Sequence, residues 1–416
     1  MIHRRSFLTG SAALGTAATV PWTRVMAAAA EALTPLPLPP PIGQAERMER
    51  LAEARALMQK NGIGAVVIEP GSSLDYFTGV QWHRSERLTA AVIPAEGDPI
   101  VVTPFFESPS VRETLAVPAE IRTWNEDEEP LRFVADFLRE RGIAGQPVGF
   151  EETDRYFIFD RLRQQIPTLK AVSANPAVRD LRMIKSPAEL ALMQTANDIT
   201  LRAMRHAGEG ARAGMTPADY GAAIDAATAA MGGNPEFSLV LIDEAAALPH
   251  GSKKPQITRP GSTVLFDCGC TVHGYQSDIS RTFVFGAPPT AEQRKVWNQV
   301  HEGQQIAIRA AKLGVPVGTI DDAVRAAYTS WGYGPGYKLP GLSHRTGHGI
   351  GMDGHEPAYI VHGDMTPLEP GMCFSDEPGI YLPGKFGVRL EDCWHMTEAG
   401  PKFFSNPPPS IDRPFG

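Results

Sequence analysis

The sequence predicts an α/β domain followed by an α+β domain. At 416 residues the chain is long enough to form two separate cores. Up to about residue 175, short β-favouring runs alternate with helical patterns, which is typical of an α/β domain. From residue 186 onward, pairs of long helices are each followed by strands. This coarse half-repeat indicates an α+β domain.

The first half contains short elements bounded by glycine and asparagine. Met48, Leu51 and Met58 have helical spacing, and Asn61-Gly62 marks the end of that helix. We expect helices over residues 45–61, 131–141 and 156–165, and strands over residues 65–68, 88–93, 100–102 and 148–150.

Four long helices in the second half each carry a start signal. Ser186-Pro187-Ala188-Glu189 combines a capping box with proline at the first helical position. Similar signals begin at Thr216, Thr290 and Thr319, and glycines mark three of the ends. The second and third of these helices flank a segment that predicts a β-hairpin.

That hairpin, over residues 266–285, places two aspartates beside otherwise apolar strands. Asp267 and Asp278 are each expected where a strand meets a turn that contains Gly269 and Gly274. A buried carboxylate is costly unless it is paired or binds a cation, and two on neighbouring strands repel each other. Taken alone, the pair is better explained as two solvated turn residues, so other segments must decide.

Three histidines lie close together in a glycine-rich segment, SHRTGHGIGMDGHEP. They are His344, His348 and His355. A single core histidine is more often structural than functional. Three of them, in a run whose glycines let the backbone approach a ligand closely, indicate a site.

Two acidic segments follow these histidines. Glu377 precedes Pro-Gly in SDEPGIY, and Arg389 and Glu391 lie in GVRLED. Because Arg389 and Glu391 are two residues apart, a strand would place both on one face. Each residue alone fits a surface turn or a surface ion pair. Together with the two hairpin aspartates they indicate one acidic site.

The charges and donor atoms of this site predict two divalent metal ions. Asp267, Asp278, Glu377 and Glu391 supply four negative charges, which two divalent cations would cancel. His348, as neutral imidazole, would add one nitrogen ligand. A set rich in oxygen with one histidine favours Mn²⁺, with Co²⁺ or Zn²⁺ as alternatives. Two such ions can activate a shared water and polarise a carbonyl.

The motifs around these residues, taken in the order in which they occur along the chain, resemble those of the pita-bread metallopeptidases. That family includes aminopeptidase P, prolidase, methionine aminopeptidase and the metal-free hydrolase creatinase. The motifs are SDISRTF, TGHGIG, EPGIY and VRLED, and YFTG at residues 76–79 also resembles the N-terminal domain of creatinase and prolidase. The resemblance covers about residues 45–405. It implies a smaller creatinase/prolidase-type α/β domain followed by a pita-bread catalytic domain.

The resemblance also implies a role for each site residue. The metal ligands would be Asp267, Asp278, His348, Glu377 and Glu391, with Asp278 and Glu391 bridging both ions. His250 and His344 would hold the substrate, and His355 would also stabilise the tetrahedral intermediate. Glu377 would move the proton to the leaving nitrogen, and Arg389 would position substrate and ligands.

The implied reaction is hydrolysis of the Xaa–Pro bond at a peptide N-terminus or in a dipeptide. A metal-activated hydroxide would attack the carbonyl, and the family implies a homodimer. One alternative is a metal-dependent C–N hydrolase of a non-peptide amino-acid derivative, creatine-like or a cyclic amidine, on the same fold. A binding module with a decayed site is a second alternative, but five filled ligand positions argue against it.

The N-terminal segment resembles a twin-arginine export signal. Arg4-Arg5 precedes Ser-Phe-Leu and a mild apolar run, and Val25-Met26-Ala27 offers a cleavage site. A chance arginine pair on an ordinary secretory signal is the alternative. We therefore expect export to a bacterial periplasm. The predicted boundaries are a signal peptide over 1–27, a Pro-rich linker over 28–44, domains over 45–175 and 176–405, and a Pro-rich tail over 406–416.

The composition excludes several other classes of protein. The net charge is −8 and no basic cluster follows the N-terminus, so we expect no nucleic-acid partner. Without an apolar run of about 18–20 residues, we expect no membrane span in the mature chain. The cysteines, at positions 268, 270, 373 and 393, contain no C-x-x-C pair. We expect free core residues, with disulfides or a shared zinc site as alternatives.

Overall fold

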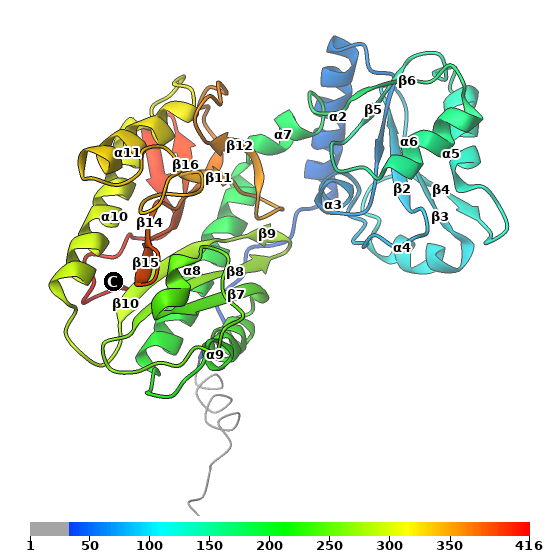
Figure 1. Cartoon of the computed structure of the whole chain (residues 1–416). Helices are drawn as coiled ribbons and strands as arrows, with labels where there is room; N and C mark the ends of the chain where they lie inside the picture. Colours follow the sequence, from blue (N-terminus) through cyan, green and yellow to red (C-terminus); the bar gives the residue numbers. More distant parts are fainter. Residues whose placement is uncertain (1–32) are drawn as a thin grey trace, which may run out of the picture.

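The computed structural model describes residues 33–416, which form the two lobes seen in Figure 1. The predicted signal peptide and the first part of the predicted linker lie outside the described residues. Within residues 33–416, no helix combines the length and the apolar character that a membrane span needs.

The N-terminal lobe is a six-stranded sheet between two layers of helices. Its elements are α2 (Gln44–Lys60), β1 (Ala65–Ile68), α3 (Ser72–Thr78), β2 (Ala90–Pro94), β3 (Ile100–Pro104), the short 3₁₀ helix η1 (Phe105–Glu107), α4 (Ser108–Thr114), β4 (Glu120–Trp124), α5 (Pro130–Glu140), β5 (Pro147–Phe150), α6 (Tyr156–Gln165) and β6 (Lys170–Ser173). The strand order is β4-β3-β2-β1-β5-β6, with β1 parallel to β5 and antiparallel to β2. This arrangement confirms the α/β prediction for the first half.

Strand β1 shows why both faces of this sheet are covered. Val66 and Ile68 belong to one core cluster, together with Leu51 and Met58 of α2. The alternate strand residues belong to a different cluster, which also contains apolar residues of α5 and α6. A strand buried on both faces reads as a continuous apolar run, and this run made β1 predictable.

The elements that sequence reasoning missed in this lobe are short or lack an apolar pattern. They are α3, α4, β4 and β6. All four residues of β6 are exposed, so no alternation marks the strand. Helix α3 follows Gly71 without a side-chain cap.

The C-terminal lobe repeats an arrangement of two helices followed by strands. Its elements are the connecting helix α7 (Arg179–Met183), then α8 (Pro187–Glu209), α9 (Pro217–Ala230), β7 (Asn234–Ile242), η2 (Asp243–Ala247), β8 (Thr263–Val272), β9 (Tyr275–Gln276), β10 (Ile279–Val284), α10 (Ala291–Ala310), α11 (Gly318–Ser330), β11 (Gly347–Gly349), β12 (Glu356–Ile360), β13 (Cys373–Asp376), β14 (Gly379–Leu382), β15 (Phe386–Arg389), β16 (Asp392–Thr397) and β17 (Gly400–Phe403). The first sheet has the order β10-β8-β7, with β9 paired to β8, and the second has the order β12-β11-β13-β16-β17, while β14 and β15 form a separate two-stranded sheet. Helices α8 and α9 pack on the first sheet, and α10 and α11 accompany the second.

The two larger sheets of this lobe are joined by a bridge between Ser280 and Glu391. The backbone N–H of Glu391 donates to the carbonyl of Ser280 at 3.0 Å, and the reverse bond is 3.3 Å long. Next to this pair, Arg281 and Asp392 form an ion pair whose side chains are both 0% exposed. Because Arg281 and Asp392 flank the junction, they fix β10 against the start of β16.

All four predicted helices are present, and three of the four predicted start signals cap their helix. Ser186, Thr216 and Thr290 each cap their helix with the expected partner three residues later. Helix α11 instead begins at Gly318 without a side-chain cap. Asp321 faces the interior, where it accepts hydrogen bonds from the backbone N–H groups of Thr346 and His362. It thereby supports the histidine-rich segment.

The hairpin is confirmed, but the position predicted for Asp267 is wrong. Asp267 lies inside β8, opposite Ser280 of β10, and the strand continues to Val272. The turn is His273-Gly274, where both residues have positive φ. Gly269 lies inside the strand, and the position requires glycine because a Cβ there would lie 2.3 Å from the Ser277 carbonyl oxygen. Asp278 does sit directly before a strand, as predicted.

The ion pair at the sheet junction gives a test of the fold. Arg281→Ala is expected to lower the free energy of unfolding by about 3–5 kcal/mol, because it leaves Asp392 buried without its cation. Urea unfolding of the purified protein measures this change. The exposed pair Arg294–Asp412, at 43% and 51% exposure, is the matched control. Arg294→Ala should cost less than about 1 kcal/mol, and equal losses in both variants would contradict the assignment.

Candidate active site

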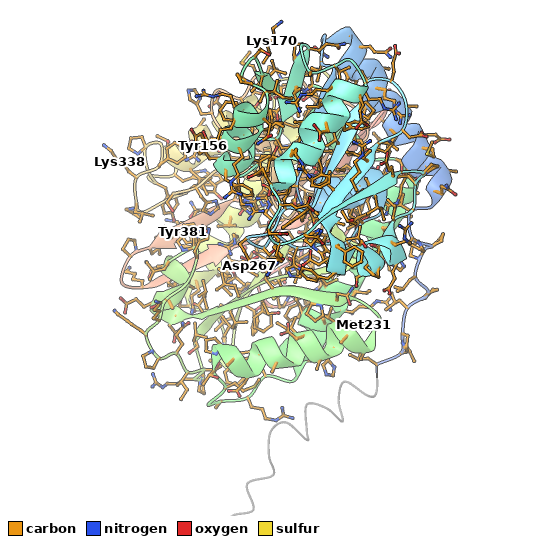
Figure 2. The ribbon with its side chains drawn as sticks, turned by 90° about the vertical axis from the view of Figure 1, so that its right-hand side faces the viewer. Tyr156, Lys170, Met231, Asp267, Lys338 and Tyr381 are labelled. Atoms are coloured by element: carbon orange, nitrogen blue, oxygen red, sulfur yellow. The ribbon has the colours of Figure 1, made fainter. Side chains whose placement is uncertain are left out.

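One pocket of the C-terminal lobe is lined by every residue that the sequence analysis named as a candidate catalytic, substrate-binding or metal-binding residue. The pocket has a volume of about 680 Å³. Its walls include His250, Asp267, Asp278, His344, His348, His355, Glu377, Arg389 and Glu391. In Figure 2, Asp267 lies near the middle of the molecule, away from the peripheral Lys170 and Met231.

Four carboxylates reach the pocket from strands or strand ends. Asp267 lies in β8, and Asp278 directly precedes β10. Glu377 directly follows β13, and Glu391 lies two residues after the end of β15. Oxygens of Asp267, Asp278 and Glu391 lie within 4.8 Å of one another. Ligand atoms of Glu377, Glu391 and His348 form a second group and also lie within 4.8 Å of one another. Glu391 belongs to both groups, so the groups adjoin.

The donor atoms of these groups fit divalent cations. Asp278 Oδ1 and Glu391 Oε1 are buried and have no hydrogen-bond partner among the residues that the structure describes. A buried anionic oxygen without a partner is costly unless a cation binds it. The set is mainly oxygen with one imidazole nitrogen, which suits hard or borderline divalent metals. The residues present therefore fit a metal centre.

The pKa values of the carboxyls reflect burial and mutual repulsion. Burial raises the pKa of Asp278 and of Glu391 well above the usual range, and the neighbouring carboxylates raise both further. Burial also raises the pKa of Glu377 to about 8, although Arg389 acts in the opposite direction. Burial is the largest cause of each shift, and positive charge added to the cluster would act in the opposite direction.

His348 presents a free nitrogen to the carboxylates. Its Nδ1 lies 3.0 Å from the Gly349 carbonyl oxygen, so Nδ1 carries the proton and donates it. Its Nε2 then faces Glu377 Oε1 at 3.5 Å and Asp278 Oδ2 at 3.7 Å. Burial lowers the pKa of His348 to about 3, which keeps the ring neutral. A neutral ring with a free nitrogen has the form required of a metal ligand.

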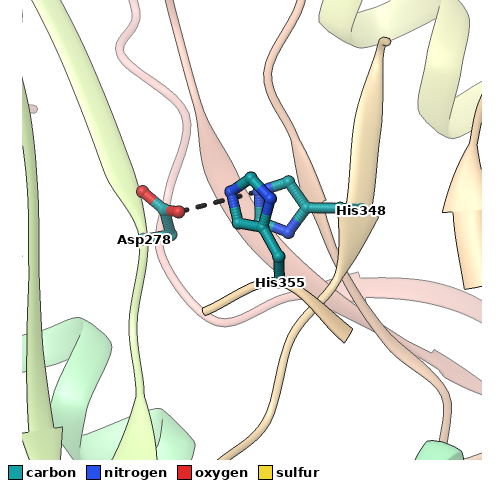
Figure 3. Close-up of side chains that lie close together, drawn as sticks. All are labelled: Asp278, His348 and His355. Atoms are coloured by element: carbon teal, nitrogen blue, oxygen red, sulfur yellow. Dashed lines mark ion pairs between the residues drawn. The ribbon is translucent and has the colours of Figure 1, made fainter. Parts of the chain in front are cut away.

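His355 stacks on His348 at the mouth of the site. The two ring centroids are 3.8 Å apart and the planes are inclined by 24°. Figure 3 shows both rings on the side of the pocket opposite Asp278. His355 is exposed, whereas His348 is buried. His355 can therefore meet a molecule that enters from solvent.

Arg389 organises the side of the pocket that contains Asp267 and His344. Its Nη2 pairs with Asp267, and its Nε donates to Ser280 Oγ at 2.9 Å. Its Nη1 donates to Tyr381 Oη at 3.2 Å, and that hydroxyl lies 2.7 Å from His344 Nε2. Because His344 Nδ1 donates to a carbonyl, its Nε2 accepts the Tyr381 proton. Arg389 thus links a carboxylate of the site to His344.

The pairing of Arg389 with Asp267 modifies the charge count made from sequence. One of the four negative charges is offset by a guanidinium that is itself buried, with a side chain 3% exposed. The pocket nevertheless keeps three carboxylates without such a partner, so an excess of negative charge remains.

Sequence reasoning missed several residues of the pocket. Ser280 lies 3.1 Å from Asp267 Oδ1 and 2.8 Å from Glu391 Oε2, and so joins two carboxylates. Tyr381 connects Arg389 with His344, and its place at the end of the EPGIY motif could have revealed it. Phe237, Leu239 and Arg345 also line the cavity, but only the fold brings them there.

The cysteines are free and buried, as predicted. Cys268 and Cys270 point to the apolar face of β8, away from Asp267, and belong to the main core cluster. Cys393 Sγ donates to the Asp278 carbonyl oxygen at 3.1 Å.

The repulsion within the site predicts an unusual effect of neutralising a carboxylate. In metal-free protein at a pH high enough to ionise the cluster, Glu391→Gln should raise the thermal midpoint, because it removes one of the mutually repelling charges. The same variant should lose most of the stabilisation that added Mn²⁺ gives the wild type. Calorimetry with chelator and with metal measures both effects. The exposed Glu398→Gln is the control, and destabilised metal-free E391Q would contradict the argument.

Comparisons with known proteins agree with this geometry. The model of metallopeptidase family M24 matches residues 191–398, and the model of the creatinase/prolidase N-terminal domain matches residues 50–184. The probable dipeptidase PepE of Mycobacterium tuberculosis is 34% identical over 86% of this chain and 94% of that protein. The Xaa-Pro dipeptidase of Lactobacillus helveticus is 33% identical over 80% of this chain and 90% of its own length.

Solved structures share the whole two-lobed architecture. Dipeptidase PepE from Mycobacterium ulcerans has a TM-score of 0.80 at 32% identity, covering 89% of this chain and 98% of that one. Recombinant prolidase from Thermococcus sibiricus has a TM-score of 0.79 at 29% identity, covering 86% and 96%. These likenesses confirm the fold class that the motifs implied, a creatinase/prolidase-type domain followed by a pita-bread domain. The chain is a metallopeptidase and belongs to family M24.

Proposed function

We propose that this enzyme hydrolyses the Xaa–Pro bond of dipeptides or of peptide N-termini with the help of two divalent ions. The observation that carries the proposal is the pocket in which two adjoining groups of ligands share Glu391 and hold unpaired carboxylate oxygens. Relatives named Xaa-Pro dipeptidase and prolidase support the substrate class.

Each adjoining group would hold one metal ion. Asp267, Asp278 and Glu391 would hold one, and His348, Glu377 and Glu391 would hold the other. Asp278 Oδ2 also faces His348, which suits a second bridging carboxylate. The oxygen-rich donor set supports Mn²⁺ as the native metal. When bound, the ions supply Lewis-acid polarisation of the scissile carbonyl and activation of water.

The chain's own residues would bind and orient the peptide. Phe237 and Leu239 give the pocket an apolar wall against which a proline ring can pack. His250 and His355 are exposed at its rim and can donate hydrogen bonds to substrate carbonyls. Arg389, held by Ser280 and Tyr381, keeps Asp267 in place rather than contacting substrate. This division separates substrate contact from ligand positioning.

We also propose that the protein is exported and works as a homodimer in a bacterial periplasm. The adjacent Arg4-Arg5 before an apolar run supports the twin-arginine route. That route suits an enzyme that takes up its metal before export. The family resemblance supports the dimer.

Metal removal tests the reaction itself. Purified protein loaded with Mn²⁺ should contain about two ions per chain and cleave Xaa–Pro dipeptides, and chelator should abolish turnover. Metal analysis and a ninhydrin assay for released proline measure these effects. Glu377→Ala should reduce activity at least about 10³-fold while the fold persists. Glu398→Ala serves as control. Full activity after thorough metal removal would exclude the two-metal proposal, and inactivity on every Xaa–Pro substrate would favour a non-peptide C–N substrate.

Export is tested by a substitution that preserves charge. Replacing Arg4 and Arg5 together by lysine should leave folded protein in the cytoplasm of a bacterial host, because twin-arginine recognition needs the arginine pair. Fractionation followed by immunoblotting measures the distribution. Arg24→Lys, outside the pair, should not change it. Undiminished periplasmic protein in the double variant would indicate an ordinary secretory signal.

A further inference from the structure

The loop of residues 350–355 carries His355 into the active site. It joins β11 to β12 and ends directly before Glu356. The His355 ring stacks on His348, but no hydrogen bond holds it among the residues that the structure describes. The backbone of the loop therefore determines where His355 lies.

Glu356 folds this loop onto itself. Its Oε1 accepts hydrogen bonds from the backbone N–H groups of Met352 and Asp353, at 3.0 and 3.1 Å. Its Oε2 lies 3.0 Å from the ammonium group of Lys185. The Glu356 side chain is only 5% exposed. A buried carboxylate with three such partners makes the loop a defined structure.

Arg182 ties this folded loop to the N-terminal lobe. It lies on α7, the short helix between the two lobes in Figure 1. Its Nη2 binds Asp353 Oδ2 at 2.8 Å and also pairs with Glu356. Its Nη1 donates to Ser73 Oγ at 2.8 Å, and Ser73 donates to Glu151 Oε1 at 2.6 Å.

A second contact from the N-terminal lobe reaches the same loop. Ser72 Oγ donates to Asp353 Oδ1 at 2.5 Å. Asp353 and Glu356 flank Gly354 and His355, so one guanidinium holds both sides of the segment that bears the histidine.

We propose that Arg182 is a positioning residue for His355, and that it makes the N-terminal lobe part of the active site. The inference deepens the proposed peptidase function and rests on it for its kinetic part. Displacing a substrate-contacting group by about 1 Å can reduce the rate by roughly 100-fold. Arg182→Met would release the loop from α7, while Lys185 still pairs with Glu356. The buried carboxylate of Glu356 therefore keeps a cation in this variant.

The alternative is that Arg182 only joins the two lobes. Two other arginines separate these roles. Arg50 also joins the lobes, at 3.4 Å from Glu189 and 3.0 Å from Tyr275, without touching the loop. Arg179 lies on α7 itself and pairs with Glu152, at 3.8 Å. Arg50→Met and Arg179→Met are therefore the matched controls for lobe contact and for helix charge.

The test combines hydrogen exchange with steady-state kinetics on the metal-loaded full chain. In Arg182→Met, amide exchange in peptides covering residues 350–356 should accelerate about tenfold or more, because two backbone bonds to Glu356 lose support. On an Xaa–Pro dipeptide, kcat should fall roughly 100-fold while KM changes less than about threefold. Arg182→Lys should recover part of both losses. Both controls should stay within about twofold of wild type in this loop and in kcat.

Two results would overturn the inference. One is unchanged exchange in residues 350–356 of Arg182→Met, and the other is a kcat equal to that of Arg179→Met. If Arg182→Met fails to fold, exchange and kcat of Arg182→Lys decide, because a shorter reach must still loosen the loop. If the wild type cleaves no Xaa–Pro substrate, the proposed function fails. The exchange comparison still decides whether Arg182 positions the loop.

Discussion

Concentrated negative charge in a buried pocket is the constraint on which the rest of this structure depends. Asp267, Asp278, Glu377 and Glu391 converge where burial penalises their ionised forms. The described chain sets one arginine, Arg389, directly against this charge. A cluster of this kind survives only if the surrounding framework prevents the carboxylates from moving apart, and if cations complete it.

The framework meets that requirement by taking its carboxylates from a strand and from residues next to strand ends. The two larger sheets of the C-terminal lobe join at Ser280 and Glu391, and the buried Arg281–Asp392 pair reinforces the junction. Strand-borne groups are held more rigidly than groups on loops. The histidines assigned to substrate contact lie instead on connecting segments. This difference suits their tasks, because metal ligands need fixed distances whereas substrate contacts must admit and release a peptide.

The N-terminal lobe is more than an appended domain. One continuous apolar cluster contains residues of α2 and β1 together with residues of α8, α9 and β8. The polar contacts of Arg182 and Ser72 extend this union to the edge of the active site. The chain ends contribute as well. The backbone N–H of Leu36, in the predicted linker, donates a hydrogen bond to the Met231 carbonyl, and Phe415 of the predicted tail packs against Phe266 and Phe283.

The sequence by itself determined the elements and the ligand set of this protein. Capping boxes, apolar periodicity and glycine stops are local signals, and so most helices were predicted to within a few residues. The five ligand positions were recognisable because their motifs occur in a fixed order. Asp267 was predicted at a strand end because a carboxylate inside an apolar strand is unfavourable unless a partner offsets its charge. The local sequence does not show that partner. Tertiary structure alone brought Arg389 to Asp267, Tyr381 to His344 and Arg182 to the His355 loop. These contacts join residues 37 to 174 positions apart, and no local pattern encodes a pairing over such distances.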